Sequence, residues 1–158
     1  MDFGWRRTLQ ALALAGVAAT AAPAFAGTDP MEVVQALYAQ PSLALGGPQS
    51  AGYLAEDLMT AMRSASGRSG SSGPIGFDYR YGARETEISG FELLPQVDND
   101  QAKVVAVFKN FGKPESVDWT LCRDHGGDWR IADASSNTGP QDWDLRQILH
   151  LPVDDIRC

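Results

Sequence analysis

The first half of the chain carries two runs in which apolar residues recur every three or four positions, as in a helix that buries one face. The first run follows Asp29 and Pro30, a capping residue and a residue suited to the first helical turn. Its apolar positions are Met31, Val34, Leu37 and Tyr38. The second run follows Ser50, which can cap a helix, and contains Leu54, Leu58 and Met62. We therefore predict two N-terminal helices, each with a stripe that faces the core.

A segment rich in serine and glycine, residues 64–76, follows the second run. This composition favours a flexible surface connection over a regular element. A glycine-rich loop can also cradle phosphate, but a P-loop needs a preceding strand and a following Lys-Ser/Thr pair, which this segment lacks. The sequence therefore predicts a flexible loop over 64–76 without a phosphate-binding role.

From Thr86 onward the pattern changes to strands separated by short turns. We expect strands over 86–94, 102–111, 115–123 and 129–134, with turns at 97–100, 112–114 and 124–128. Sequential hairpins of this kind form an antiparallel meander. A short final helix is indicated by Trp143, Leu145, Ile148 and Leu149. The predicted fold is α+β, with two N-terminal helices packed on a curved antiparallel sheet of about four strands and a short C-terminal helix.

The strand at residues 104–108 is apolar on both faces. A half-solvated antiparallel strand would alternate, so we expect both faces to be covered. Helices can cover one face, and the C-terminal tail or a second subunit the other, which leaves a homodimer open. Cys122 lies an odd number of positions after Trp119 and so points to the opposite face.

Residues 1–26 have the pattern of a removable export signal. Arg6 and Arg7 give a positive start, an alanine-rich apolar run follows, and Ala24-Phe25-Ala26 is a small-x-small cleavage motif that leaves Gly27 first. The run is too short and too rich in alanine for a stable membrane span, which needs about 20 strongly apolar residues. The twin-arginine and general secretory routes both stay open. We predict a single domain over 27–158 that is periplasmic or secreted, without stable membrane insertion.

Export changes how the two cysteines, Cys122 and Cys158, are interpreted. An even number of cysteines in an oxidising compartment favours a disulfide between them. Two free thiols, or a Cys158 that pairs between chains, are the alternatives. An intramolecular bond would draw the C-terminal tail toward the sheet face to which Cys122 points.

The charge of the exported part argues against nucleic acid as a partner. Removing Arg6, Arg7 and Asp2 lowers the net charge from −7 to −8. Nucleic acid and anionic lipid are bound by clustered lysine and arginine, whereas the basic residues of this chain are scattered.

Six short segments together resemble a known fold. They are 33–38 (VVQALY), 54–58 (LAEDL), 77–79 (FDY), 107–114 (VFKNFGKP), 127–133 (GDWRIAD) and 145–149 (LRQIL). Their order resembles the cone-shaped α+β architecture of nuclear-transport-factor-2-like and cystatin-like domains, and more closely an exported bacterial family of unknown function with that fold. Where that family tends to carry Phe-Asp-Pro and then Gln-Asp, this chain has Phe77-Asp78-Tyr79 and Arg84-Glu85.

The resemblance implies a pocket between the helices and the sheet, in which some relatives place a carboxylate as a proton-transfer base. Asp78, Asp118 and Asp133 are the carboxylates nearest strong strands, with Tyr79 and Tyr81 as candidate donors. By the alternation of strand residues, Asp133 shares a face with the preceding tryptophan and isoleucine of its strand. The candidate base is Asp133 or Asp78, and the candidate binding residues are Asp78, Tyr79, Tyr81 and Asp133. In the structural alternative, these carboxylates accept backbone N–H bonds.

A metal site and a familiar catalytic motif are not indicated. Cys122, Asp124, His125 and Asp128 match no zinc spacing, and Cys122 is expected to be oxidised. The sequence has no Ser-His-Asp order, nucleophile elbow or His-Glu-x-x-His motif. We expect neither a metal nor a cofactor.

Three functions remain, one of which is a stress or envelope-maintenance protein without any ligand. The leading hypothesis is a noncatalytic envelope module that holds a small ligand or a partner protein, as an immunity protein holds a toxin; an acidic surface would suit a basic partner. The competing hypothesis is a ketosteroid-isomerase-like or hydratase-like enzyme that uses Asp133 or Asp78 as general base. An enclosed apolar cavity with an unpaired carboxylate and a facing tyrosine would favour the enzyme. A pocket filled by Trp129 and Leu121, with paired carboxylates, would favour the module.

Overall fold

A computed structural model describes residues 27–41, 43–69, 75–98, 101–139 and 141–158. The expected signal over residues 1–26 therefore lies outside the described residues, as do positions 70–74 of the expected loop. Within the described ranges, no helix has the length and apolar character needed to cross a membrane.

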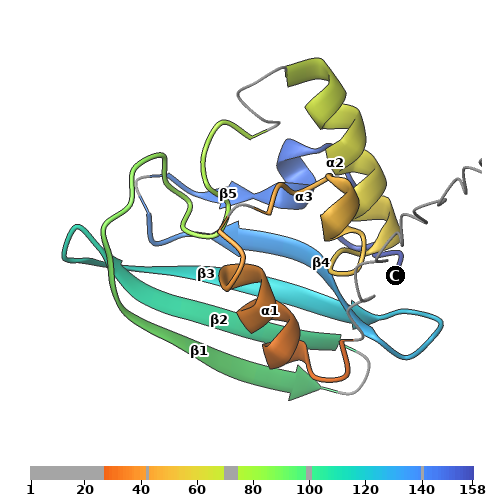
Figure 1. Ribbon diagram of the computed structural model, residues 1–158, viewed down its shortest axis with the longest axis horizontal. Coiled ribbons are helices and arrows are strands. Elements are labelled where there is room, and N and C mark those ends of the chain that lie inside the picture. The colour runs from red at the N-terminus through yellow and green to blue at the C-terminus, as the bar shows by residue number, and fades with distance from the viewer. Residues whose placement is uncertain (1–26, 42, 70–74, 99–100, 140) are drawn as a thin grey trace, which may run out of the picture.

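The chain is α+β, built on a five-stranded antiparallel sheet with strand order β1-β2-β3-β4-β5 (Figure 1). The strands are β1 (Ile88–Asp98), β2 (Gln101–Asn110), β3 (Lys113–Arg123), β4 (Trp129–Ser136) and β5 (Trp143–Asp144). The helices are α1 (Pro30–Tyr38), the 3₁₀ turn η1 (Pro48–Ser50), α2 (Glu56–Ser69) and α3 (Leu145–Ile148). The first four strands follow one another as hairpins, which is the meander that the sequence predicts.

The fifth strand corrects the expected count of about four. Trp143, expected in the last helix, instead pairs with Ser136 of β4. Asp144 is also extended and caps α3, since its carboxylate accepts the Gln147 N–H at 2.8 Å. The indole of Trp143 is buried against Gly82, where an added Cβ would lie 2.6 Å from the indole nitrogen. This packing holds residue 143 in the sheet.

Strand β1 is longer than expected because it runs through Pro95, which pairs with Val104. Since β1 is an edge strand, the missing proline N–H can face the free edge and cost no ladder bond. A register irregularity between Ser89 and Glu92 interrupts the same strand. Proline and bulges are two devices that discourage another chain from pairing with a sheet edge.

Helix α1 begins as the sequence predicts, whereas α2 is displaced. Asp29 accepts the Met31 N–H at 2.8 Å and caps α1. Helix α2 begins at Glu56 rather than after Ser50, because Leu54 forms a parallel bridge with Ile131 at the open edge of β4. The helix then continues to Ser69, so the first part of the loop expected over 64–76 is helical.

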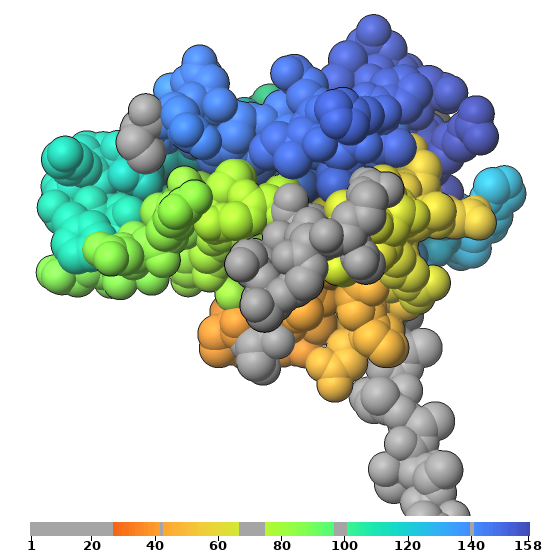
Figure 2. Space-filling model, turned by 90° about the horizontal axis from the view of Figure 1, so that it is seen from above, coloured from red at the N-terminus to blue at the C-terminus, as the bar shows by residue number. Residues whose placement is uncertain are grey.

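The two long helices lie in different places relative to the sheet, and the expected packing of both on it stays a prediction. Helix α1 contacts β1, β2 and β4, while α2 lies beside α3 on the β4 side (Figure 1). Figure 2 shows the C-terminal segment, in blue, forming one side of the molecule along the 75–87 segment and α2. The core holds Trp119 and Trp129, both fully buried, with side chains from α1 and the sheet around them.

The face of β2 away from this core is only partly covered. Val104, Ala106 and Phe108 are buried, whereas Val105 and Val107 are half-buried. The C-terminal tail reaches β3 through a disulfide between Cys122 and Cys158, as predicted, with a Cα–Cα distance of 6.0 Å. Cover of the remaining outer face by a second subunit stays a prediction.

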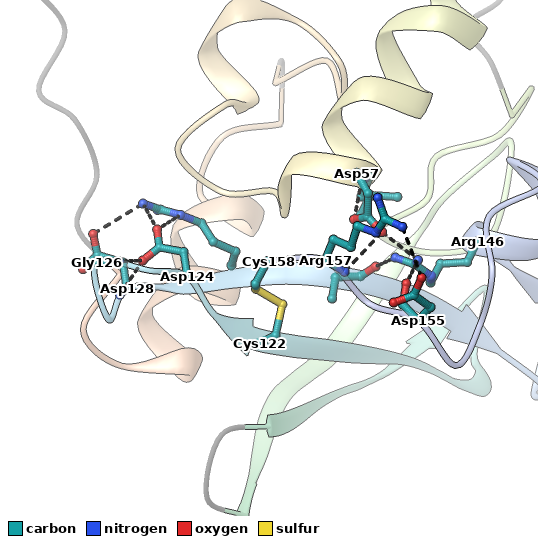
Figure 3. Close-up of a disulfide and its surroundings, with 12 residues drawn as sticks. Asp57, Cys122, Asp124, Gly126, Asp128, Arg146, Asp155, Arg157 and Cys158 are labelled. Carbon is teal, nitrogen blue, oxygen red and sulfur yellow. Dashed lines mark hydrogen bonds and ion pairs between the residues drawn. A yellow bond between two sulfur atoms is a disulfide. The ribbon is translucent and has the colours of Figure 1, made fainter.

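A fully buried guanidinium joins the tail to the rest of the fold (Figure 3). Arg146 has no exposed surface, and its Nη2 atom lies 2.7 Å from the carboxylate of Asp57 in the first turn of α2. Its Nη1 donates to the Ala132 carbonyl of β4 at 3.2 Å. Its Nε and Nη2 donate to the tail carbonyls of Pro152 and Asp155 at 2.7 and 3.1 Å. Arg146 therefore connects β4, α2, α3 and the tail.

Replacing Arg146 with alanine tests this connection. We expect Arg146→Ala to lower the free energy of unfolding by about 3 kcal/mol or more, because it leaves a largely buried carboxylate without its cation. Urea denaturation at pH 7 measures the change. The matched control is Arg157→Ala, whose side chain is 77% exposed and whose loss should change stability by less than about 0.5 kcal/mol. Equal effects of the two substitutions would contradict the proposed role of Arg146.

Candidate functional site

The first candidate carboxylate, Asp78, is held by Arg80. The guanidinium binds both carboxylate oxygens, with Nε–Oδ1 and Nη2–Oδ2 distances of 2.9 Å, and the Arg80 backbone N–H donates to Oδ1 at 3.0 Å. Arg80 is itself only 8% exposed. A two-pronged pair of this kind is among the stronger charge-assisted interactions. Asp78 is thus engaged with its neighbour rather than directed at an open site.

The other donors of Arg80 fasten the 75–87 segment to the end of α1. Nη1 and Nη2 donate to the carbonyls of Gln40 and Pro41 at 3.0 and 2.7 Å. The hydroxyl of Tyr38 in α1 donates to the Arg80 carbonyl at 2.6 Å. Burial raises the pKa of Tyr38 far above its ordinary value, so this hydroxyl stays protonated as a donor.

The two candidate tyrosines belong to the same packing. Tyr79 is buried and donates its hydroxyl to the Leu43 carbonyl at 3.2 Å, and burial raises its pKa well above the usual range. Tyr81 is half-buried and packs edge-on against the rings of Phe108 and Tyr38 at centroid distances of 5.4 and 5.6 Å. The structure therefore brings Asp78, Tyr79 and Tyr81 together, as an anchor between a loop and a helix.

The second candidate carboxylate, Asp133, lies on the face opposite to the one expected. Leu121 pairs with Ile131 and Thr120 with Asp133, so β4 has one extra residue, Ala132, at this point. Such a bulge reverses the alternation beyond it. Asp133 therefore points away from the face that carries Ile131, and the strict alternation expected from the sequence is wrong here.

Asp133 is hydrogen bonded on its new face. Its Oδ1 accepts the backbone N–H groups of Ala134 and Arg146 at 2.8 and 3.1 Å. Desolvation, and then the charge of Asp144, raise the pKa of Asp133 to about 7, against the lowering effect of those two N–H bonds and of the Arg146 charge. The structural alternative, in which the carboxylate accepts backbone bonds, describes this geometry.

Carboxylates other than Asp78 and Asp133 line an open depression. A hollow of about 250 Å³ lies where β3, β4, β5 and α3 meet, and we call it the acidic hollow. Its lining is Asp118, Ser135, Ser136, Asn137, Asp142, Trp143, Asp144 and Gln147. Asp118 pairs with Lys103 at 3.0 Å, and Asp144 caps α3. Sequence reasoning identified Asp118 as a candidate carboxylate but missed Asp142 and Asp144, since their placement depends on the unexpected fifth strand.

The large apolar side chains of the sheet are buried. Trp119, Leu121 and Trp129 are at most 1% exposed. Neither Asp78 nor Asp133 lines any of the four hollows, of about 250, 380, 440 and 330 Å³, whose linings consist of described residues. Among the side chains whose placement is described, every buried nitrogen and oxygen atom has a hydrogen-bond partner.

The two aspartates that the sequence places near Cys122 and His125, Asp124 and Asp128, are bonded within the β3–β4 hairpin. Asp124 accepts the N–H groups of Gly126 and Asp128 at 2.8 and 3.0 Å and pairs with Arg130 at 2.8 Å. Cys122 is in the disulfide. No group of three or more histidine, cysteine, aspartate or glutamate side chains within the described ranges is placed to hold a metal ion.

The raised pKa of Asp133 makes stability depend on pH. Because the folded-state pKa of about 7 lies above the ordinary value of 3.8, the folded protein binds more protons between these limits. The free energy of unfolding therefore falls as pH rises from about 4 to 7 and levels off above it. Asp133→Asn keeps an acceptor oxygen without the charge, so we expect it to flatten this fall and to be more stable than the wild type at pH 8.

Urea denaturation across this pH range measures the effect, and NMR titration of the carboxyl carbon of Asp133 gives its pKa directly. The control is Asp154→Asn, which removes a carboxylate from an exposed position in the tail. Identical pH dependence of Asp133→Asn and the wild type would show that the carboxyl is ionised throughout the range.

Comparison of the chain with protein-family models, with curated proteins and with solved structures returned no match. The expected resemblance to cone-shaped domains therefore stays a prediction.

Proposed function

We propose that the protein is a noncatalytic interaction module of the cell envelope, periplasmic or secreted, that binds a basic partner protein. The burial of Trp129 and Leu121, together with the pairing of the candidate carboxylate, supports this proposal. Trp129 and Leu121 are at most 1% exposed, and Asp78 is paired with Arg80. A small-molecule site is normally a concave, largely apolar pocket with a few convergent polar groups. A core packed in this way favours recognition by the surface.

Charge supports a basic partner. The net charge of residues 27–158 is −8, and two of the arginines in this part, Arg80 and Arg146, are buried inside the fold. The acidic hollow adds a recessed surface with Asp118, Asp142 and Asp144 around it. Complementary charge accelerates association and disfavours wrong partners. An immunity-like protein that blocks a basic toxin is one example of such a module.

Compartment and family are part of the same proposal. A Cys122–Cys158 disulfide is typical of proteins that fold in an oxidising compartment. The export-signal pattern of residues 1–26 would direct the chain to such a compartment, and the resemblance to cone-shaped domains gives the expected architecture. We infer that the active form begins at Gly27 and carries the bond.

The raised pKa of Asp133 favours a second candidate function, the small isomerase-like or hydratase-like enzyme. A carboxyl that titrates near pH 7 suits general-base catalysis. Two observations oppose the enzyme. The hydroxyl of Tyr79 already donates to a backbone carbonyl, and Asp133 lines none of the four hollows. The interaction module therefore explains more of the structure than the enzyme does.

Pull-down of native envelope proteins on the oxidised chain 27–158 tests the proposal. We expect the wild type to retain a basic protein, identified by mass spectrometry, and to release it as salt rises from 50 to 500 mM, about the range over which exposed charges become screened. The double variant Asp118→Asn/Asp142→Asn should weaken binding of that protein by about tenfold or more.

The matched control is Glu87→Gln/Asp154→Asn, which removes the same charge from two exposed positions that do not line the acidic hollow. Equal weakening by both double variants would mean that net charge alone drives binding. Retention of a small apolar acid or ketone instead of a protein would support the enzyme.

A further inference from the structure

The last eight residues, 151–158, form a segment that contains neither helix nor strand, and we call it the strap. Besides the disulfide, the strap is held at four backbone groups. The Leu151 N–H donates to the Arg146 carbonyl at 2.8 Å, and the carbonyls of Pro152 and Asp155 accept from the Arg146 guanidinium. The Arg157 N–H donates to Asp57 at 3.4 Å (Figure 3). Few bonds to the body of the protein characterise segments that open locally.

The two cysteines of the disulfide, Cys122 in β3 and Cys158 at the end of the strap, differ in accessibility. Cys122 is 7% exposed and belongs to the core of the sheet. Cys158 is half-buried and lines a surface hollow of about 330 Å³, beside Arg63, Glu56 and Thr60 of α2. Thiol–disulfide exchange depends on access of the attacking thiolate to one sulfur of the bond. An incoming thiolate therefore meets Cys158 before Cys122.

We propose that Cys158 is a thiol-exchange site, at which a dithiol reductant, such as an envelope protein with two neighbouring cysteines, opens the strap while the sheet stays folded. The inference does not depend on the partner proposed above. A disulfide that is accessible from the surface is of the labile kind, whereas a fully buried one resists reduction in the native state.

The chemistry is a two-electron exchange. One thiolate of the reductant attacks Cys158 Sγ and forms a mixed disulfide, while the Cys122–Cys158 bond breaks and Cys122 Sγ leaves with the electron pair and takes up a proton. The second thiolate of the reductant then attacks the reductant's first sulfur, which is bonded to Cys158 in the mixed disulfide. Cys158 leaves as a thiolate and takes up a proton. The cysteines of this chain are reduced, and the reductant ends as a disulfide.

Release of the strap would change which groups are exposed at the surface. Without the bond, the strap keeps its backbone interactions with Arg146 and Asp57 and the packing of Leu151 and Ile156 against the core. When it moves away, the Arg146 guanidinium loses the carbonyls of Pro152 and Asp155 and becomes accessible beside the N-terminus of α2. A hollow of about 440 Å³ already lies there, lined by Asp57, Leu151 and Arg157 among others. The exchange thus frees N–H donors of a guanidinium that stays paired with Asp57.

Glutathione, a monothiol that forms trappable mixed disulfides, identifies the attacked sulfur. The oxidised chain 27–158 is incubated with glutathione without denaturant, quenched with acid, and digested for mass spectrometry. We expect glutathione on Cys158 and a free thiol on Cys122, formed at a rate that does not change with low concentrations of urea. Glutathione on Cys122, or reaction only when urea unfolds the protein, would overturn the proposal.

Amide hydrogen exchange tests the opening itself. Reduction by dithiothreitol should speed exchange of the strap amides, such as those of Leu151 and Arg157, by about tenfold or more, while β2 and β3 stay protected. Cys158→Ser should reproduce the reduced pattern. Should this variant fail to fold, the reduced wild type alone decides: loss of protection throughout the sheet, or no change in the strap, would contradict the proposal.

Discussion

The burial of the Arg146 guanidinium is the constraint on which the C-terminal half of the structure depends. Taking a cation out of water is expensive unless its donors are satisfied. Arg146 directs four of its five N–H donors to a carboxylate and three carbonyls from four places in the chain: Asp57, Ala132, Pro152 and Asp155. The bulge of β4, the start of α2 and the path of the tail have to agree with one another, because β4 and α2 each supply one of these acceptors and the tail supplies two.

Arg80 repeats the arrangement in the 75–87 segment. It joins Asp78 to the carbonyls that follow α1, as Arg146 joins Asp57 to the carbonyls of the tail. Each buried arginine is paired with an aspartate, so the net charge of −8 of residues 27–158 comes from the other charged residues. The candidate carboxylate Asp78 is therefore a structural partner, and the remaining excess of carboxylates is the basis for the proposed basic partner.

Local signals predicted what depends on neighbours in sequence, including the Asp29 cap of α1 and the order of four hairpin strands. The pairing of Cys122 with Cys158, 36 residues apart, was predicted from the even number of cysteines and the expected compartment. The features that were missed depend on contacts between distant segments. One extra residue at Ala132 turns Asp133 to the other face, and no residue type marks that position. Trp143 has the spacing of a helical residue, yet its pairing with β4 and its fit against Gly82 place it in a strand. Burial of Arg146 requires a tail that folds back, which helical periodicity does not reveal.

The hydrogen-exchange rate of the Arg146 Nε–H, followed by NMR in the oxidised chain 27–158, tests the central claim most directly. A guanidinium locked between β4, α2 and the tail predicts that this proton exchanges orders of magnitude more slowly than that of a solvated arginine, such as Arg157, whose side chain is 77% exposed. Equal, rapid exchange of the two protons would contradict the account, since it would place the Arg146 guanidinium in water.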